Sequence, residues 1–224
     1  LLVGGVSAAL FAWAYPRAFP YAPNGWQISS QEATEIALER LRSLGPPIEN
    51  AYVVTHIVPE ALLERRLLVG PNRSTPSARQ AREHLGRQVV AWEVLVYPPS
   101  ALREEFAYQA RISTQGEIQA LRVEVDPKQA GGPLFEAAAR RRSNEFLASQ
   151  GIDLAHFEMP SVRSRQLETR TDWIVRYADR RPSPGQSRHG VDVFFAGDRL
   201  SGFEYWFEDP EEAEIQKLVQ TQFT

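Results

Sequence analysis

Residues 30–44 carry apolar side chains at the spacing of a helix that buries one face. Ser29 and Glu32 stand three residues apart at the start of this run, the pattern of an N-terminal capping box in which each side chain bonds the other residue's backbone N–H. Gly45 supplies a stop, and the two prolines after it prevent continuation. The pattern predicts a helix whose inner face holds Ala33, Ile36, Ala37, Leu41 and Leu44.

The segments that follow alternate apolar with polar residues, which is typical of strands buried on one side. The alternation predicts strands near 51–58, 90–96, 106–112 and 118–125, a further strand at 65–69, and a polar insertion over 70–86 with a short helix in it. Between Ile118 and Leu121 the apolar positions step by three residues instead of two. Such a step indicates a β-bulge that resets the face of the strand.

The same order of patterns restarts after Gly131-Gly132. Pro133 suits the first position of a helix, whose inner face would hold Leu134, Ala138, Phe146 and Leu147 before a stop at Gly151. Alternating strands follow at 173–177, 191–195 and 200–207. The last of them repeats the three-residue step, from Leu200 to Phe203. This strand and the one at 118–125 are the return strands of their hairpins, and an Asp-Pro pair follows each of them.

The sequence therefore predicts an α+β protein built from two related units, each a helix packed on an antiparallel sheet. The units span residues 28–130 and 131–209, and a terminal helix occupies 210–224. Each unit is so short that it would bury little of its surface alone, so we expect the two to pack together.

The N-terminal segment 1–15 is uncharged and almost wholly apolar, and a linker with three prolines follows it at 16–27. Two interpretations stay open. Trp13, Tyr15 and Phe19 would form an interfacial belt if the segment is the distal part of a membrane anchor, whereas Ala12-Trp13-Ala14 would be a cleavage site if it is a signal peptide. Both predict attachment to the cell membrane or export, with the soluble part extracytoplasmic.

Composition narrows the chemistry. The chain of 224 residues has a formal charge of −3, which argues against nucleic acid as a partner. It has no cysteine, which excludes disulfides, thiolate metal sites and cysteine nucleophiles. No two of its four histidines lie within four residues of each other, and no nucleotide-binding or hydrolase motif is present. Glu204 and Glu208 share a strand face, but about 13 Å separates their backbones, too far for a glycosidase pair. The sequence thus predicts no catalytic, cofactor or metal residue.

Two features are candidates for partner binding. Arg140, Arg141 and Arg142 would contact anionic lipid headgroups or an acidic partner, unless they simply form a solvated helix face. Trp206 stands between Tyr205 and Phe207 in a strand, so it faces away from the core and could anchor a peptide or a neighbouring domain. Burial between the two units is the alternative for Trp206.

The arrangement resembles the PepSY-type, cystatin-like domain: a helix, a Trp-containing strand, and a hairpin with a Gly turn that closes on an acidic residue. In the first unit the resemblance is carried by Trp92-Glu93-Val94, Tyr108, Gly116, Ile118, Val123 and Asp126. In the second it is carried by Trp173-Ile174-Val175, Val193, Gly197, Leu200 and Tyr205.

This resemblance implies a membrane-tethered, extracytoplasmic, non-catalytic module that senses or restrains a protease, or regulates the membrane protein attached to it. Its partner would be a peptide or protein, and it would need no cofactor. The layout is also similar to the N-terminal region of bacterial CAAX-type (CPBP) intramembrane proteases. The alternative function is therefore an accessory ectodomain of such an enzyme, with the catalytic core beyond residue 224.

Overall fold

A computed structural model describes residues 26–45, 48–60, 63, 67, 80–81, 85–99, 108–183 and 185–210. Among the described residues, α2 (Ser30–Ser43) and α5 (Glu136–Ser149) are α-helices described from end to end, and there are short 3-10 turns, η1 (Gly86–Gln88) and η3 (Leu154–His156). The strands are β1 (Tyr52–Pro59), β2 (Val90–Tyr97), β3 (Tyr108–Ser113), β4 (Ile118–Arg122), β5 (Ser161–Gln166), β6 (Thr171–Ala178), β7 (Arg188–Ala196) and β8 (Arg199–Glu208).

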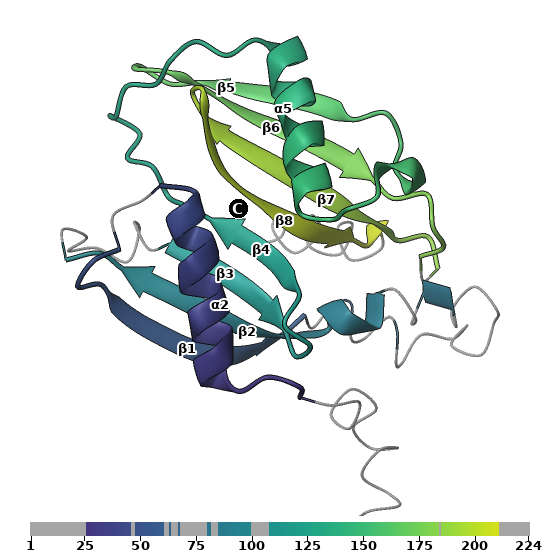
Figure 1. The fold of residues 1–224 in the computed structure, drawn as a ribbon. Helices are drawn as coiled ribbons and strands as arrows, with labels where there is room; N and C mark the ends of the chain where they lie inside the picture. Colours follow the sequence, from purple (N-terminus) through teal and green to yellow (C-terminus); the bar gives the residue numbers. More distant parts are fainter. Residues whose placement is uncertain are drawn as a thin grey trace, which may run out of the picture.

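All eight strands belong to one antiparallel sheet in the order β1-β2-β3-β4-β8-β7-β6-β5. The first half of the chain contributes α2 with β1 to β4, and the second half contributes α5 with β5 to β8 (Figure 1). A short pairing of β4 with β8 joins the halves, through Ala120↔Glu204, Leu121↔Phe203 and Arg122↔Gly202. The predicted α+β class with helices on an antiparallel sheet is confirmed.

Both helices cover the same face of the sheet, and the inward residues of all the central strands meet them in one hydrophobic core (Figure 1). We call this the helix-covered face, and the opposite one the helix-free face. Leu121 of β4 and Phe203 of β8 are buried side by side at the junction, so the core continues from one half into the other.

Helix α2 forms as its pattern predicts. Ser29 is the N-cap, and its side chain and that of Glu32 make the reciprocal bonds of a capping box. Ala33, Ala37 and Leu41 are fully buried, while the flanking apolar residues of the predicted face are partly buried. The helix ends before Gly45, which has φ +86°, a backbone conformation that glycine adopts without strain.

Helix α5 differs from its prediction in start and in face. It begins at Glu136 instead of Pro133, because the preceding chain is held extended: the N–H of Gly132 donates to Asp198 in the β7–β8 turn. The buried residues are Ala139, Ser143 and Leu147, whereas the predicted Ala138 and Phe146 are only partly buried. Small side chains at Ala139 and Ser143 allow the helix to sit close to the sheet. Because two of the three buried residues are alanine and serine, the sequence of α5 shows no strong apolar stripe.

The two predicted irregularities are present in both return strands. In the β3–β4 pair the register shifts between Arg111 and Ile112, and in the β7–β8 pair it shifts between Phe194 and Phe195. The extra residue falls in β4 and in β8, within the three-residue steps of their apolar patterns. Each bulge turns the remainder of the return strand so that its apolar residues reach the core.

Two strand predictions need correction. Strand β5 has no counterpart among the predictions, because Val162 is its only apolar residue and an alternating pattern is lacking. The strand predicted at 65–69 is wrong at Leu67, which is helical and, with Leu63, belongs to a small second cluster beside Val89.

The predicted anchor or signal segment 1–15, most of the linker 16–27, and the terminal helix after Pro210 lie outside the described residues. Over the residues that the structure does describe, no helix combines the length and the apolar character needed to cross a membrane.

Candidate functional site

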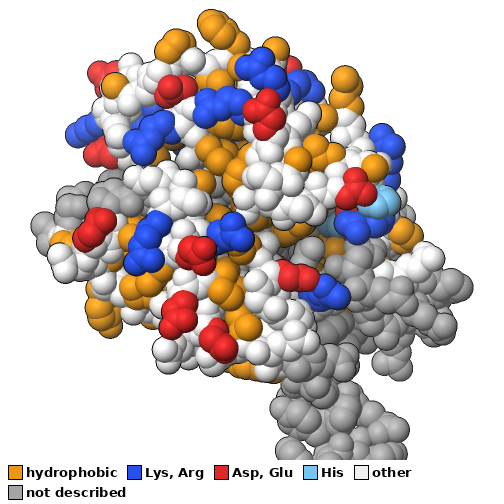
Figure 2. Space-filling model, viewed as in Figure 1, with side chains coloured by type: hydrophobic (Ala, Val, Ile, Leu, Met, Phe, Trp, Pro, Cys, Tyr) orange, Lys and Arg blue, Asp and Glu red, His pale blue; other side chains and the backbone are white. Residues whose placement is uncertain are grey.

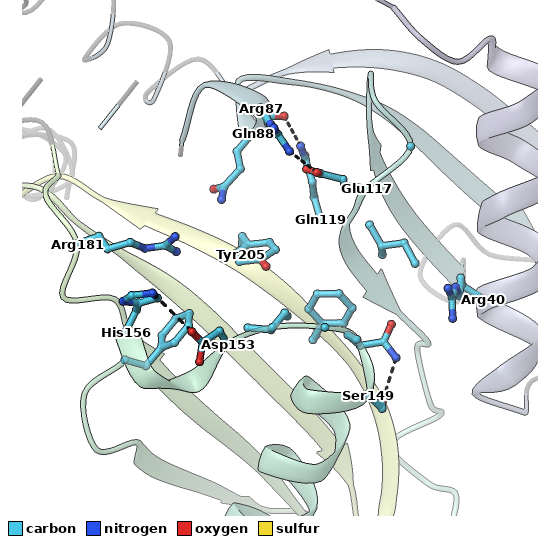
Figure 3. A pocket seen from close by; sticks show the side chains of 17 residues that line it. Arg40, Arg87, Gln88, Glu117, Gln119, Ser149, Asp153, His156, Arg181 and Tyr205 are labelled. Atoms are coloured by element: carbon cyan, nitrogen blue, oxygen red, sulfur yellow. Dashed lines mark hydrogen bonds and ion pairs between the residues drawn. The ribbon is translucent and has the colours of Figure 1, made fainter. Parts of the chain in front are cut away.

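A cleft of about 710 Å³ opens on the helix-covered face where the two halves meet (Figure 3). One wall comes from the 86–88 turn and the β3–β4 hairpin, and the other from the C-terminal end of α5 together with η3. The floor is made by strand β8. Around the cleft, acidic and basic side chains are interspersed over both halves, with apolar atoms showing between them (Figure 2).

The floor of the cleft is aromatic. Phe203 is buried and packs edge-on against Phe146 of α5 at 5.5 Å between ring centroids, and Tyr205 packs edge-on against Phe203 at 6.2 Å. Burial raises the pKa of Tyr205, so its phenol is neutral at physiological pH. Among the described residues none hydrogen-bonds to its hydroxyl. The phenol therefore offers a donor and acceptor to a ligand in the cleft.

A buried carboxylate positions Arg181 beside this phenol. Asp179 is almost fully buried, accepts from Arg181 Nε at 3.0 and 3.1 Å, and lies 3.6 Å from His189 Nε2. Burial alone would raise the pKa of Asp179, but its contact with His189 and its hydrogen bonds from Arg181 outweigh it and hold the pKa well below its usual range. Held in this way, Arg181 extends toward Tyr205 (Figure 3).

The opposite wall is fixed by contacts within the first half. Arg87 forms an ion pair with Glu117, and the side-chain amide of Gln119 donates to the carbonyl of Arg87. The 86–88 turn is thereby tied to the β3–β4 hairpin. Arg40 of α2 stands at the far end of the cleft and has no ion-pair partner within the described part of the chain (Figure 3).

Among the described residues that line the cleft, one histidine lies close to a carboxylate. His156 Nε2 and Asp153 Oδ2 are 3.6 Å apart and both side chains are exposed, and no serine or threonine hydroxyl of the described residues bonds to the histidine. Ser149 uses its hydroxyl to donate to the carbonyl of Phe146. In the described ranges no group of three His, Asp or Glu residues could hold a metal ion. What the cleft provides is an aromatic floor with hydrogen-bond donors around it.

The three consecutive arginines do not form one patch. Arg140 pairs with Glu136 at 2.8 Å and donates to the carbonyl of Pro160, and Arg142 donates to the carbonyl of Asp198 at 2.5 Å. These two tie α5 to the start of β5 and to the β7–β8 turn. Arg141 alone is well exposed, with only a loose contact to Glu145 at 3.8 Å.

Trp206 is half-buried and lies on the helix-free face, so the sheet stands between it and the arginines of α5. Its ring rests on Gly190, where an added Cβ would be 2.7 Å from the ring, and the Arg176 guanidinium stacks on it at 4.5 Å from the centroid. The structure thus places the predicted binding residues on opposite faces. Their role in partner binding remains a prediction.

Carboxylates on the helix-free face form ion pairs with arginines. Asp192 is buried and accepts hydrogen bonds from Nε and Nη2 of Arg176, whose guanidinium also bonds Glu208. Burial raises the pKa of Glu204 and the neighbouring Asp192 adds to this, although Arg122 at 3.4 Å acts in the opposite direction. These ion pairs join side chains of different strands.

Sequence reasoning did not identify the cleft. The alternation of Tyr205 with Phe203 and Phe207 predicts that it faces the core, and nothing in that pattern indicates that it lines an opening. Arg40, Arg87 and Arg181 are separated widely in sequence and come together only through the β4–β8 junction. Compared with known proteins, the chain matches no family model, no curated protein and no solved structure.

Proposed function

We propose that the chain is a non-catalytic binding domain that holds a polypeptide segment of a partner in the cleft between its two halves. The observation that carries this proposal is the aromatic floor at Tyr205, whose hydroxyl is available and flanked by the positioned Arg181. An extended peptide suits such a site, because its backbone carbonyls accept from arginine and tyrosine donors while its side chains pack on the rings.

The two halves are proposed to be related PepSY-like units. Support comes from the shared order of an α-helix followed by four antiparallel strands in each half, and from a bulge at the same place in the last strand of each half. A strand order that is the same from either edge is what joining two copies through their last strands would produce.

The domain is further proposed to be tethered to the cell membrane by residues 1–15, on the extracytoplasmic side, where it senses or restrains a protease or an attached membrane domain. The uncharged apolar segment and the proline-containing linker support this placement. The alternative, an accessory ectodomain of a CAAX-type intramembrane protease, is supported by the same layout. Under that alternative the ligand of the cleft would be a segment of the attached protease.

A peptide selection tests the binding proposal. Random peptides displayed on phage are selected on the full chain, and enriched peptides are measured by calorimetry. We expect Tyr205→Phe, which removes only the hydroxyl, and Tyr205→Ala to weaken binding progressively. Tyr52→Ala should leave affinity unchanged, because Tyr52 is 72% exposed on the edge strand β1 and does not line the cleft. Failure to enrich any peptide, or hydrolysis of a bound peptide, would contradict the proposal.

Location is tested separately with the cysteine-free chain. Met159 is 87% exposed, so a single cysteine placed there by Met159→Cys is open to reagents. In intact bacterial cells we expect labelling by a membrane-impermeant maleimide and recovery of the label with the membrane fraction. Labelling only after lysis would show that the domain is not extracytoplasmic.

A further inference from the structure

Strand β5 is an open edge of the sheet. Its six residues pair in unbroken antiparallel register with β6, from Ser161↔Arg176 to Gln166↔Thr171, and five of the six are exposed. Along its outer side no described strand pairs with it. The N–H and C=O groups that point outward are therefore available to another extended chain.

This edge carries positive charge that no described residue neutralises. Arg163 and Arg165 alternate with Val162, which packs on the core, so both arginines project to the helix-free face. Neither has an ion-pair partner among the described residues. Asp172 lies across from Arg165, but it is bonded to Arg170 at 2.7 Å and to the N–H of Gly197 at 3.1 Å.

Beside the edge is a hollow of about 430 Å³ that shares this charge. Ile174 and Phe194 form its apolar base, next to Arg163 along one row of the sheet. The charged side chains that line it are four arginines against two carboxylates, namely Arg122, Arg163, Arg165, Arg170, Glu124 and Asp172. The surface next to β5 thus has an excess of positive charge.

The other edge of the sheet has no such character. Strand β1 carries no arginine, lysine or carboxylate, and its one histidine, His56, lies 3.2 Å from Glu93. A second copy of the chain is a poor occupant for β5, because antiparallel pairing of two β5 strands would bring arginines against arginines. Charge complementarity points instead to an acidic strand.

We propose that β5 is a docking edge for an extended acidic segment of a partner protein, which adds a ninth strand to the sheet. Backbone hydrogen bonds along β5 supply affinity. Acidic side chains at alternate positions of the segment, on the helix-free side, meet Arg163 and Arg165 and supply selectivity. This surface is distinct from the cleft, so it stands or falls independently of the proposed function.

The test uses blocked synthetic peptides and the full chain. One peptide alternates glutamate with valine, a second alternates lysine with valine, and a third keeps the glutamates but replaces every valine with proline, so that it cannot form a strand. Affinity is measured by calorimetry, and a nitroxide on the first peptide reports its position through relaxation of backbone amide signals. The variant is Arg163→Glu/Arg165→Glu. Its matched control is Arg42→Glu/Arg180→Glu, the same charge change at two exposed positions outside β5.

We expect the glutamate–valine peptide to bind, to broaden the amide signals of β5 and not those of β1, and to lose about tenfold or more in affinity in the β5 variant, since two favourable charge pairs become repulsive. The control variant should keep most of the affinity, and Tyr205→Phe should have no effect.

Equal binding of the proline-containing peptide would overturn the proposal, since it would mean charge attraction without strand pairing. Broadening at β1, or preference for the lysine peptide, would also overturn it. A dimer of the chain that the β5 variant abolishes would identify a second copy as the occupant and refute the acidic strand.

Discussion

Replacing Arg170 should destabilise the protein by removing the hydrogen bonds that hold the segment between its two halves. Its side chain is 3% exposed and donates from Nη1 to the carbonyls of Asp126 at 2.6 Å and Gln129 at 2.7 Å. From Nη2 it donates to the carbonyl of Val125 at 3.1 Å, and from Nε to Asp172 at 2.7 Å. One buried guanidinium thus holds the chain that runs from β4 toward α5.

The magnitude follows from what Arg170→Met would leave behind. Three backbone carbonyls lose a charged donor, and bonds of this kind contribute about 1.5–3 kcal/mol each. Breaking a buried ion pair from one side costs about 3–5 kcal/mol. Asp172 keeps a bond from the N–H of Gly197 and is 28% exposed, so its loss is at the lower end. Because these terms overlap, we expect a loss of about 3–5 kcal/mol in the free energy of unfolding.

Urea unfolding, followed by circular dichroism and by tryptophan fluorescence, measures this loss. Arg165→Met is the matched control: it removes an arginine from the neighbouring edge strand that has no described ion pair, and we expect a change within about 0.5 kcal/mol. Arg170→Lys should fall between the two, because a lysine cannot reach three carbonyls and a carboxylate together. A loss below about 1 kcal/mol for Arg170→Met would refute the reasoning, since it would mean that water replaces the guanidinium at no great cost.

Three further outcomes are expected. Ser29→Ala should lower the midpoint of thermal unfolding by removing the N-cap of α2, a loss of about 1 kcal/mol. Gly202→Ala should lower stability by about 3 kcal/mol or more, because a Cβ there would lie 1.8 Å from the Leu121 carbonyl at the β4–β8 junction; Gly45→Ala, with open space around it, should cost about 1 kcal/mol from backbone strain alone. Asp179→Asn should lower the free energy of unfolding most above about pH 4, because there the carboxyl is ionised in the unfolded state and its depressed pKa stabilises the folded state. In urea titrations, the difference in unfolding free energy between this variant and the wild type should shrink as the pH falls below that value.

The parts of the fold that were predicted correctly are those determined by residues close together in the sequence. Ser29, Glu32 and Gly45 set the ends of α2 through contacts within a few residues, and each of them appears in the structure as its residue type indicates. The two bulges were predictable for the same reason, because an extra residue in a strand shifts the period of its apolar positions directly.

Features that depend on distant partners left no such trace. Pro133 suits a helix start, yet the bond from Gly132 to Asp198, more than sixty residues along the chain, keeps that segment extended. Nothing in the sequence near Arg170 indicates that it is buried, because the residues that surround it belong to the chain between β4 and α5. The cleft depends on the β4–β8 junction, so neither Tyr205 nor Arg181 could be assigned to it from its own neighbourhood.

The topology also explains why one edge of the sheet, and not both, is a candidate for binding. Because the halves join through their last strands, the first strand of each half, β1 or β5, becomes an outer edge. If the halves are related as proposed, these edges began as equivalent surfaces. They are now different: β1 carries His56 beside Glu93, while β5 carries Arg163 and Arg165 without described partners. Protection of an edge against aggregation requires charge of either sign, and it applies equally to both ends of the sheet. A basic edge at one end only is better explained by an acidic partner that docks there.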